Sequence, residues 1–100
     1  MTIQKDIAGY WDTRAEGYSL RTIDEIKSPK GEAWVKRIKE LLTLPAGSAV
    51  ADMGCGAGFL ALAAARAGLT ATGFDVSEGM LEEARANAEA LRLTVRFQKA

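Results

Sequence analysis

The pattern of apolar and polar positions divides the chain into a helical first part and a second part that alternates strands with helices. Between residues 3 and 24 large apolar side chains recur at three- and four-residue spacings, which is typical of helix. These side chains are Ile3, Ile7, Tyr10, Trp11 and Tyr18. Gly9 and Gly17 interrupt the pattern, so we expect two short helices there rather than one long helix.

A further helix is predicted over residues 29–44. Ser28 followed by Pro29 is typical of a helix start in which the serine caps the first turn. The apolar side chains then fall on one stripe, opposite lysines and glutamates. They are Trp34, Ile38, Leu41 and Leu42. The proline and glycine of segment 45–47 end this helix.

After residue 47 short apolar runs alternate with helical patterns. Strands are predicted over 48–53, 70–76 and 93–98, and helices over 59–68 and 77–92. Gly68 ends the first of these helices and Ser77 caps the second. Strand, helix, strand, helix, strand implies parallel pairing with right-handed crossovers. The sequence therefore predicts an α/β fold with a helical lead over 1–45 and a βαβαβ half-domain over 46–100.

Composition and charge narrow the classes of function. The chain has 13 Lys and Arg against 13 Asp and Glu, so nothing points to nucleic acid or acidic lipid as a partner. There is no histidine and Cys55 is the one cysteine, which argues against a metal site, a histidine-based triad and a disulfide. The most apolar run is too short to span a bilayer, and the start lacks the apolar core of a signal peptide. We therefore expect a cytoplasmic protein.

Residues 50–58, VADMGCGAG, are the most informative stretch, because a glycine-rich loop follows a strand. Such a loop brings backbone N–H groups close to a ligand, although the same glycines suit a structural turn. The spacing of Gly56, Gly58 and Ala61 also fits the last part of a dinucleotide fingerprint. Asp52 argues against that ligand, because a carboxylate beside a pyrophosphate is repelled by about 1 kcal/mol or more. A ligand that carries a cation, such as an ammonium group, suits Asp52 better.

A second carboxylate, Asp75, ends the second predicted strand, where nucleotide-binding folds place an acid against the ribose hydroxyls. It can accept from both hydroxyls in two charge-assisted hydrogen bonds. The ligand then needs a ribose, an amine and a carboxylate for the helix N-terminus, and S-adenosylmethionine has all three. Two structural alternatives remain, in which Asp52 caps the next helix and Asp75 is a turn residue before Ser77.

The segment VADMGCGAGFLAL, followed by GFDVSEGML, resembles the first two motifs of class I S-adenosylmethionine-dependent methyltransferases. Within that family the chain is most similar to the small-molecule group that includes the ubiquinone and menaquinone methyltransferases. The motif resemblance covers residues 48–98, and YWDTRAEGYS is similar to the aromatic N-terminal lead of that group. It implies a Rossmann-like methyltransferase fold, S-adenosylmethionine as the cofactor and a small-molecule methyl acceptor.

The resemblance also implies roles for single residues. The loop against the methionine moiety would consist of Gly54, Cys55, Gly56 and Gly58. Asp52 would face the ammonium group, and Asp75 would hold the ribose hydroxyls. Val76 and Met80 would flank the adenine, with Met80 as a core residue the alternative. A lid would come from Tyr18, with Tyr10 and Trp11, unless these aromatic residues are core anchors.

The chain departs from the family's pattern at its end. A family member would continue beyond residue 100 with an acid that contacts adenine and with a fourth strand beside the first. The chain therefore resembles the N-terminal part of such an enzyme, truncated to helices and a three-stranded parallel half. The first strand becomes an open edge, and we expect a homo-oligomer that covers it.

Two classes of function stay open at this point. The chain is either the cofactor-binding part of a methyltransferase or a non-catalytic cofactor-binding or interaction fragment. A nicotinamide-dinucleotide half-domain is the less favoured third possibility because of Asp52. No catalytic residue and no acceptor atom can be assigned from the sequence.

Overall fold

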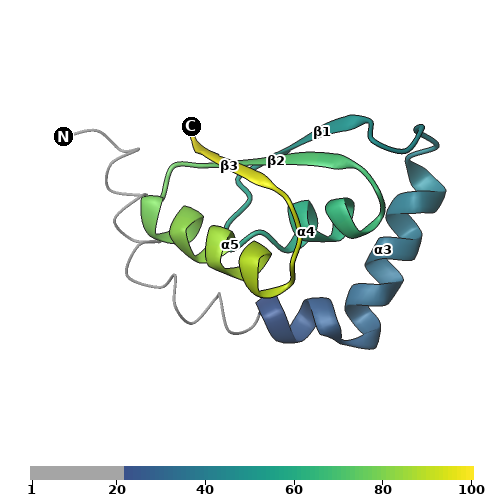
Figure 1. Ribbon diagram of the computed structural model, residues 1–100, viewed down its shortest axis with the longest axis horizontal. Helices are drawn as coiled ribbons and strands as arrows, with labels where there is room; N and C mark the ends of the chain where they lie inside the picture. Colours follow the sequence, from purple (N-terminus) through teal and green to yellow (C-terminus); the bar gives the residue numbers. More distant parts are fainter. Residues whose placement is uncertain (1–21) are drawn as a thin grey trace.

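The computed structural model describes residues 22–100, and a three-stranded parallel sheet forms its centre (Figure 1). The strands are β1 (Ala49–Met53), β2 (Thr70–Asp75) and β3 (Arg96–Lys99), in the spatial order β1-β2-β3. The register pairs Asp52 with Gly73, and Asp75 with Lys99. The predicted parallel sheet and the position of its first strand at an edge are confirmed.

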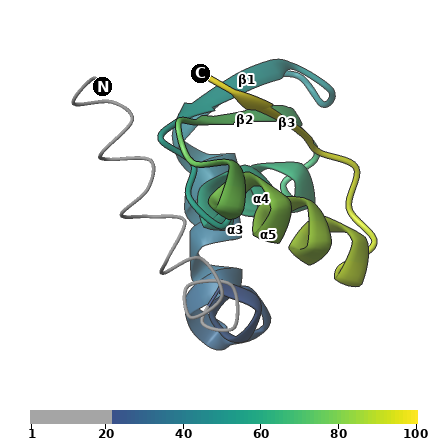
Figure 2. The same ribbon diagram turned by 90° about the vertical axis from the view of Figure 1, so that its left-hand side faces the viewer.

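The helices lie on one face of this sheet, as Figure 1 and Figure 2 show. They are α3 (Pro29–Leu41), α4 (Phe59–Arg66) and α5 (Glu78–Ala90), and a short helical segment at 22–27 precedes them. Within the described part of the chain, the opposite face of the sheet carries no helix. The predicted β-α-β-α-β half is confirmed, whereas most of the two short helices expected between residues 3 and 24 lies outside the described residues.

The core lies between the sheet and helices α4 and α5. It is rich in alanine, so the helices can approach the strands closely, and a few large side chains fill the remaining space. Its buried members include Ala61, Leu62, Ala63, Ala71, Leu81, Ala84, Ala88 and Phe97. Helix α3 joins this core through an edge-to-face contact of Trp34 with Phe59, whose ring centroids are 6.4 Å apart. The helical segment at 22–27 is linked to α4, because Nη1 of Arg66 donates to the backbone oxygen of Ile26 at 3.1 Å.

Local signals in the sequence fix where several helices begin and end. Ser28 caps α3 and Ser77 caps α5, each accepting from the backbone N–H three residues further on, at 3.4 and 3.1 Å. Helix α4 ends as predicted at Gly68, which has a φ of 91°. The N–H of Leu69 then donates to the oxygen of Ala64 at 3.1 Å, which closes a Schellman motif. Helices α4 and α5 begin a few residues after β1 and β2 end, so their N-termini lie near the carboxyl ends of these strands.

Helix α3 is shorter than the apolar stripe predicts. It ends at Leu41 rather than at residue 44, and Leu42 already has a non-helical ψ of 84°. Pro45 disfavours helical backbone at Leu44, the residue before it, so the helix does not reach its predicted end. As a result Leu42 and Leu44 remain on the surface.

The third strand begins at Arg96 rather than at residue 93. The preceding residues are used to end α5, because Arg92 takes a left-handed φ of 56°. The N–H of Leu93 donates back to the oxygen of Ala88 at 2.9 Å, in the geometry that Gly68 gives at the end of α4. Leu93 and Val95 of the predicted strand are partly buried, but they belong to the segment that connects the end of α5 with β3.

Candidate functional site

The loop between β1 and α4 has left-handed backbone at each of its three glycines. The φ angles are 71° at Gly54, 56° at Gly56 and 97° at Gly58. A Cβ built at Gly54 or Gly56 would meet no atom within 4 Å, so these two glycines face open space. A Cβ at Gly58 would lie 3.2 Å from the ring of Phe97, so this third glycine serves packing. The open pair forms a backbone cradle that a ligand can approach closely.

Groups outside the loop hold its first half in place. The N–H groups of Gly54 and Cys55 both donate to the oxygen of Phe74, at 2.7 and 2.9 Å. The N–H of Gly56 donates to Oδ2 of Asp75 at 2.8 Å. The second strand therefore fixes the loop that follows the first strand, and brings Asp75 against the glycines as the sequence predicts.

Asp75 is half-buried and uses both carboxylate oxygens. Besides the bond from Gly56, its Oδ1 accepts from the N–H of Ser77 at 2.9 Å, as in an Asx turn. The turn role considered from the sequence is thus present. A carboxylate has about four acceptor sites, so two such bonds leave room for hydroxyl donors from a ligand.

Asp52 is half-buried at the carboxyl end of the edge strand. Burial is the strongest influence on its pKa and raises it above the ordinary value of 3.8. A hydrogen bond from the backbone N–H of Ala61 lowers this pKa, and the negative charge of Asp75 raises it again, leaving it raised on balance. The contact with Ala61 matches the helix-capping alternative. The two neighbouring carboxylates make a place where a bound cation relieves both desolvation and repulsion.

Cys55 points away from the open side of the loop. It is 8% exposed, and its Sγ lies 2.9 Å from the point where a Cβ of Gly73 would stand. Burial, followed by the charges of Asp75 and Asp52, raises the pKa of this thiol to about 12. The thiol is therefore neutral near pH 7 and is not a nucleophile.

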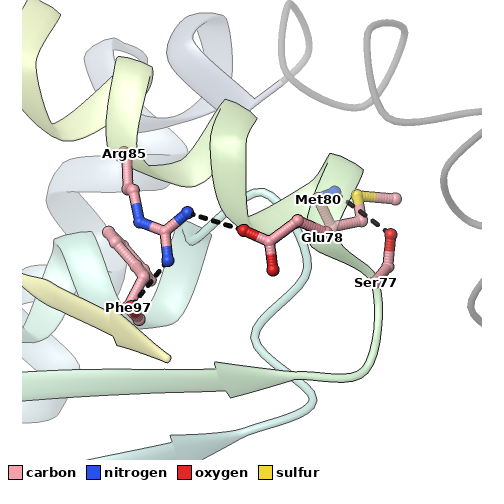
Figure 3. A network of polar contacts seen from close by, with 5 residues as sticks. All are labelled: Ser77, Glu78, Met80, Arg85 and Phe97. Carbon is pink, nitrogen blue, oxygen red and sulfur yellow. Dashed lines mark hydrogen bonds and ion pairs between the residues drawn. The ribbon is translucent and has the colours of Figure 1, made fainter. Parts of the chain in front are cut away.

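Val76 and Met80 follow Asp75 at the start of α5. Val76 is half-buried, whereas Met80 is 2% exposed and forms a small buried cluster with Ala57 of the glycine loop. Figure 3 shows Met80 beside its capping residue Ser77, and Arg85 one turn further on, bonded to Glu78 and to the backbone oxygen of Phe97. Arg85 thus connects Glu78, at the start of α5, with the backbone of β3.

Some site predictions cannot be placed, and two contributors were missed. The predicted lid residues Tyr10, Trp11 and Tyr18 lie outside the described residues. Gly73 was not singled out, although a Cβ there would meet Phe97 at 2.7 Å. Asn87 was also missed, although its Nδ2 donates to the oxygen of Ala57 in the loop at 3.0 Å. A glycine inside a strand and an asparagine inside an alanine-rich helix were the available signals.

The arrangement fits S-adenosylmethionine by its chemistry. The cradle of Gly54 and Gly56 is open to a ligand. Near it lie two carboxylates: Asp52, whose pKa is raised, and Asp75, which binds the N–H of Gly56. The first suits an ammonium group and the second suits the hydroxyls of a ribose.

Comparison with known proteins leads to the same family. Residues 50–100 match the family described as methyltransferase domain. A ubiquinone biosynthesis O-methyltransferase of Coxiella burnetii is 32% identical over 89 residues, which cover 89% of this chain and 35% of that protein. An S-adenosyl-L-methionine-dependent Diels-Alderase of Talaromyces variabilis is 35% identical over 85 residues, covering 85% of this chain and 25% of that protein.

A solved structure agrees with both relatives. The S-adenosylmethionine-dependent methyltransferase of Geobacter sulfurreducens, in complex with S-adenosylhomocysteine, aligns with a TM-score of 0.57 and 29% identity. The alignment covers 73% of this chain and 29% of that one. The chain spans about a third of the length of the Coxiella relative and a quarter of that of the Talaromyces relative. The predicted Rossmann-like methyltransferase fold is confirmed, and the chain belongs to the methyltransferase-domain family.

Proposed function

We propose that this chain is the cofactor-binding part of a class I S-adenosylmethionine-dependent methyltransferase that acts on a small molecule. The observation that carries the proposal is the pair Asp52 and Asp75, which flank an open glycine cradle at the ends of adjacent parallel strands. Ligands of open α/β sheets bind at the carboxyl ends of the strands, where this cradle lies.

Each residue then has a separate task in binding. Asp75 accepts from the ribose hydroxyls while it holds Gly56, and Asp52 balances the ammonium group of the methionine moiety. Gly54 and Gly56, with Cys55 between them, let the backbone approach that moiety, and Gly58 packs the loop onto the core. Val76 covers one side of the adenine, with Met80 beneath the loop beside it.

Bound S-adenosylmethionine would supply a methyl group on its sulfonium centre: a nucleophilic acceptor would bond to the methyl carbon in line as the carbon–sulfur bond breaks, with S-adenosylhomocysteine as the leaving group. The residues of this chain bind and orient the cofactor, and proximity and orientation are the source of catalysis that such positioning provides. None of the described residues is assigned as a catalytic acid or base.

Isothermal titration with S-adenosylhomocysteine tests the proposal. Asp75→Ala should weaken binding by about 1.5–3 kcal/mol, because it removes charge-assisted bonds to the ligand and the tie to Gly56. Glu82→Ala removes the same charge from an exposed position of α5 and should leave the affinity unchanged. Equal affinities for wild type and Asp75→Ala would remove Asp75 from the site. Tighter binding of NAD than of S-adenosylhomocysteine would overturn the assignment of S-adenosylmethionine as the cofactor.

A second candidate is cofactor binding without methyl transfer. The observation that favours it is the similarity to a protein named as an S-adenosyl-L-methionine-dependent Diels-Alderase. A radiolabelled methyl-transfer assay on a panel of small acceptors separates the two. We expect little or no turnover from this chain alone, and turnover comparable to that of a longer family member would contradict that expectation.

We also infer the setting in which the chain works. The sequence supports a helical lead over residues 1–45 before the half-domain 46–100. Tyr10, Trp11 and Tyr18, which lie outside the described residues, are candidates for a lid over the cofactor, with core anchors as the alternative. A balanced charge supports a small-molecule acceptor rather than nucleic acid, and a single cysteine supports a cytoplasmic location. In the part of the chain that the structure describes, no helix is long and apolar enough to cross a membrane.

The open edge of β1 supports a homo-oligomer. All five residues of β1 are exposed or half-buried, and apolar side chains of α3 and α4 surround the strand. An uncovered strand edge with apolar neighbours is a template for another chain. A second copy of this chain is the partner that we propose.

A further inference from the structure

Asn87 is one of the most deeply buried polar side chains of the described protein. It lies near the end of α5, three residues before Ala90, and is 1% exposed. Its Nδ2 donates to the backbone oxygen of Ala57 at 3.0 Å, a contact that joins residues 30 positions apart. Asparagine has a low helix propensity, whereas alanine, which stands at the neighbouring positions 86 and 88, has the highest. We therefore attribute the presence of asparagine at this position to the hydrogen bond that its amide donates to Ala57.

Ala57 is the part of the glycine loop that most needs a fixed partner. It stands between Gly56 and Gly58, both of which have left-handed backbone. Such residues have wide conformational freedom when nothing holds them. Phe74 and Asp75 hold the first half of the loop, and both belong to β2. The oxygen of Ala57 is the corresponding point in the second half, and a buried carbonyl needs a donor.

We propose that Asn87 is a positioning residue that locks the second half of the glycine loop in its ligand-ready conformation. It acts through Ala57, to whose backbone oxygen its Nδ2 donates. The inference that this lock tunes cofactor affinity rests on the proposed function, whereas the lock itself does not. Helix α5 thereby links the packing of the core to the shape of the loop.

The single cysteine of the chain offers a direct reporter of the lock. Cys55 is in the same loop, is buried and has a pKa of about 12, so a thiol reagent at pH 8 reacts only when the loop opens. Asn87→Ala removes the donor, and Asn87→Leu removes it while keeping the volume filled. The matched control is Ala88→Gly, which weakens the same helix at a buried position but leaves the tie intact.

Labelling of the full chain with a chromogenic disulfide reagent, without ligand, decides the matter. Both Asn87 variants should label at least about tenfold faster than wild type, the factor that loss of one buried hydrogen bond gives. Ala88→Gly should label within about threefold of wild type when global stability, measured by urea unfolding, falls equally. Labelling of the Asn87 variants at the wild-type rate, or no faster than Ala88→Gly at matched stability, would overturn the lock.

A second arm with S-adenosylhomocysteine separates this inference from the proposed function. The ligand should slow labelling of wild type, and the Asn87 variants should need about tenfold more of it for the same protection. Wild type that is not protected contradicts the proposed function while the ligand-free rates still decide the lock. Equal ligand requirements in wild type and variants would show that the lock has no effect on affinity, and would overturn that part of the inference.

Discussion

The part of the sheet formed by β2 and β3 and the edge formed by β1 differ sharply in how deeply their residues are buried. In β2 and β3 three residues are buried, namely Ala71, Gly73 and Phe97, and Ala71 and Phe97 are at most 5% exposed. On the other side β1 has no fully buried residue. All six exposed large apolar side chains of the described protein lie between residues 29 and 60. They are Trp34, Leu41, Leu42, Leu44, Met53 and Leu60.

The exposed side is shaped as well as apolar. A groove of about 320 Å³ runs between α3, α4 and β1, and its lining is apolar except at Asp52. Trp34, Ile38 and Leu60 are among the residues that line it. The β1 sequence AVADM is more apolar than the β2 sequence TATGFD, yet β1 is the less buried strand. The difference shows that a strand's burial is set by its neighbours rather than by its own residues. The covered side supplies rigidity to the loop, and the open side supplies a surface for contact.

The largest effect on stability is expected at Gly73 in β2, where the packing is closest. A Cβ there would lie 2.7 and 2.8 Å from ring carbons of Phe97 and 2.9 Å from Sγ of Cys55. Gly73→Ala should therefore lower the free energy of unfolding by about 2 kcal/mol, an overpacking cost partly offset by the reduced entropy of the unfolded chain. Urea unfolding with linear extrapolation measures this change.

The control for Gly73→Ala lies on the open side. Ala51 is an exposed residue of β1, and Ala51→Val should change the free energy of unfolding by no more than about 0.5 kcal/mol. Equal losses in the two variants would mean that β1 is packed as tightly as β2, and the comparison would fail.

The sequence predicted what depends on short-range chemistry. The caps at Ser28 and Ser77, the end of α4 at Gly68 and the parallel order of strands follow from residue types and spacing, and each is confirmed. Asp52 and Asp75 were found for the same reason, because an acid beside a glycine loop is unusual. The meeting of Asp75 with Gly56 follows from the order of the strands.

What the sequence did not predict depends on contacts between distant segments. Asn87 meets Ala57 because α5 packs beside the loop, and Gly73 meets Phe97 because the two residues are register partners in β2 and β3. No spacing rule connects these positions. The exposure of Trp34, Leu41 and Leu42 was missed for a related reason, since an apolar stripe shows that a face can be buried but not what is there to bury it.

A smaller effect on stability is expected at the C-terminal ends of α4 and α5. Both helices end in the same left-handed turn, but with different residues. Arg92 ends α5 at a φ of 56°, where Gly68 ends α4 at 91°. Arg92→Gly should raise the free energy of unfolding by about 0.5–1 kcal/mol, because left-handed backbone costs a side chain more than it costs glycine. Gly68→Ala should lower it by about 1 kcal/mol for the same reason. Thermal or urea unfolding that moves both variants in the same direction would contradict this account of the turn.

The next effect concerns pH and Asp52 on the open side. Its pKa is raised in the folded chain, mainly by burial, so the folded state favours the protonated carboxyl. This contribution to stability is fully present below the unfolded value of 3.8 and is lost as the pH rises through the folded pKa. Asp52→Asn should therefore be more stable than wild type at pH 7, and the difference should vanish below pH 3.8.

The same variant should also show the opposite trend in binding. Asn cannot balance an ammonium group, so Asp52→Asn should bind S-adenosylhomocysteine about tenfold more weakly although it is the more stable protein. Urea unfolding at several pH values and calorimetric titration measure the two trends. A variant that is less stable at pH 7 would show that Asp52 mainly caps α4 through Ala61.

The smallest effect on stability, and a large one on assembly, is expected on the exposed face itself. Met53 is 69% exposed at the end of β1, so Met53→Lys removes no buried contact and should change the free energy of unfolding of the monomer by no more than about 0.5 kcal/mol. If a second copy covers the β1 edge, the lysine places a charge in that apolar contact and should shift the protein to monomer at the same concentration. Light scattering coupled to size exclusion measures the mass, with Ala86→Lys at an exposed position of α5 as the control of equal charge change. A wild-type monomer whose β1 amides nonetheless exchange slowly would end the proposal, because that edge would then be protected without a second copy.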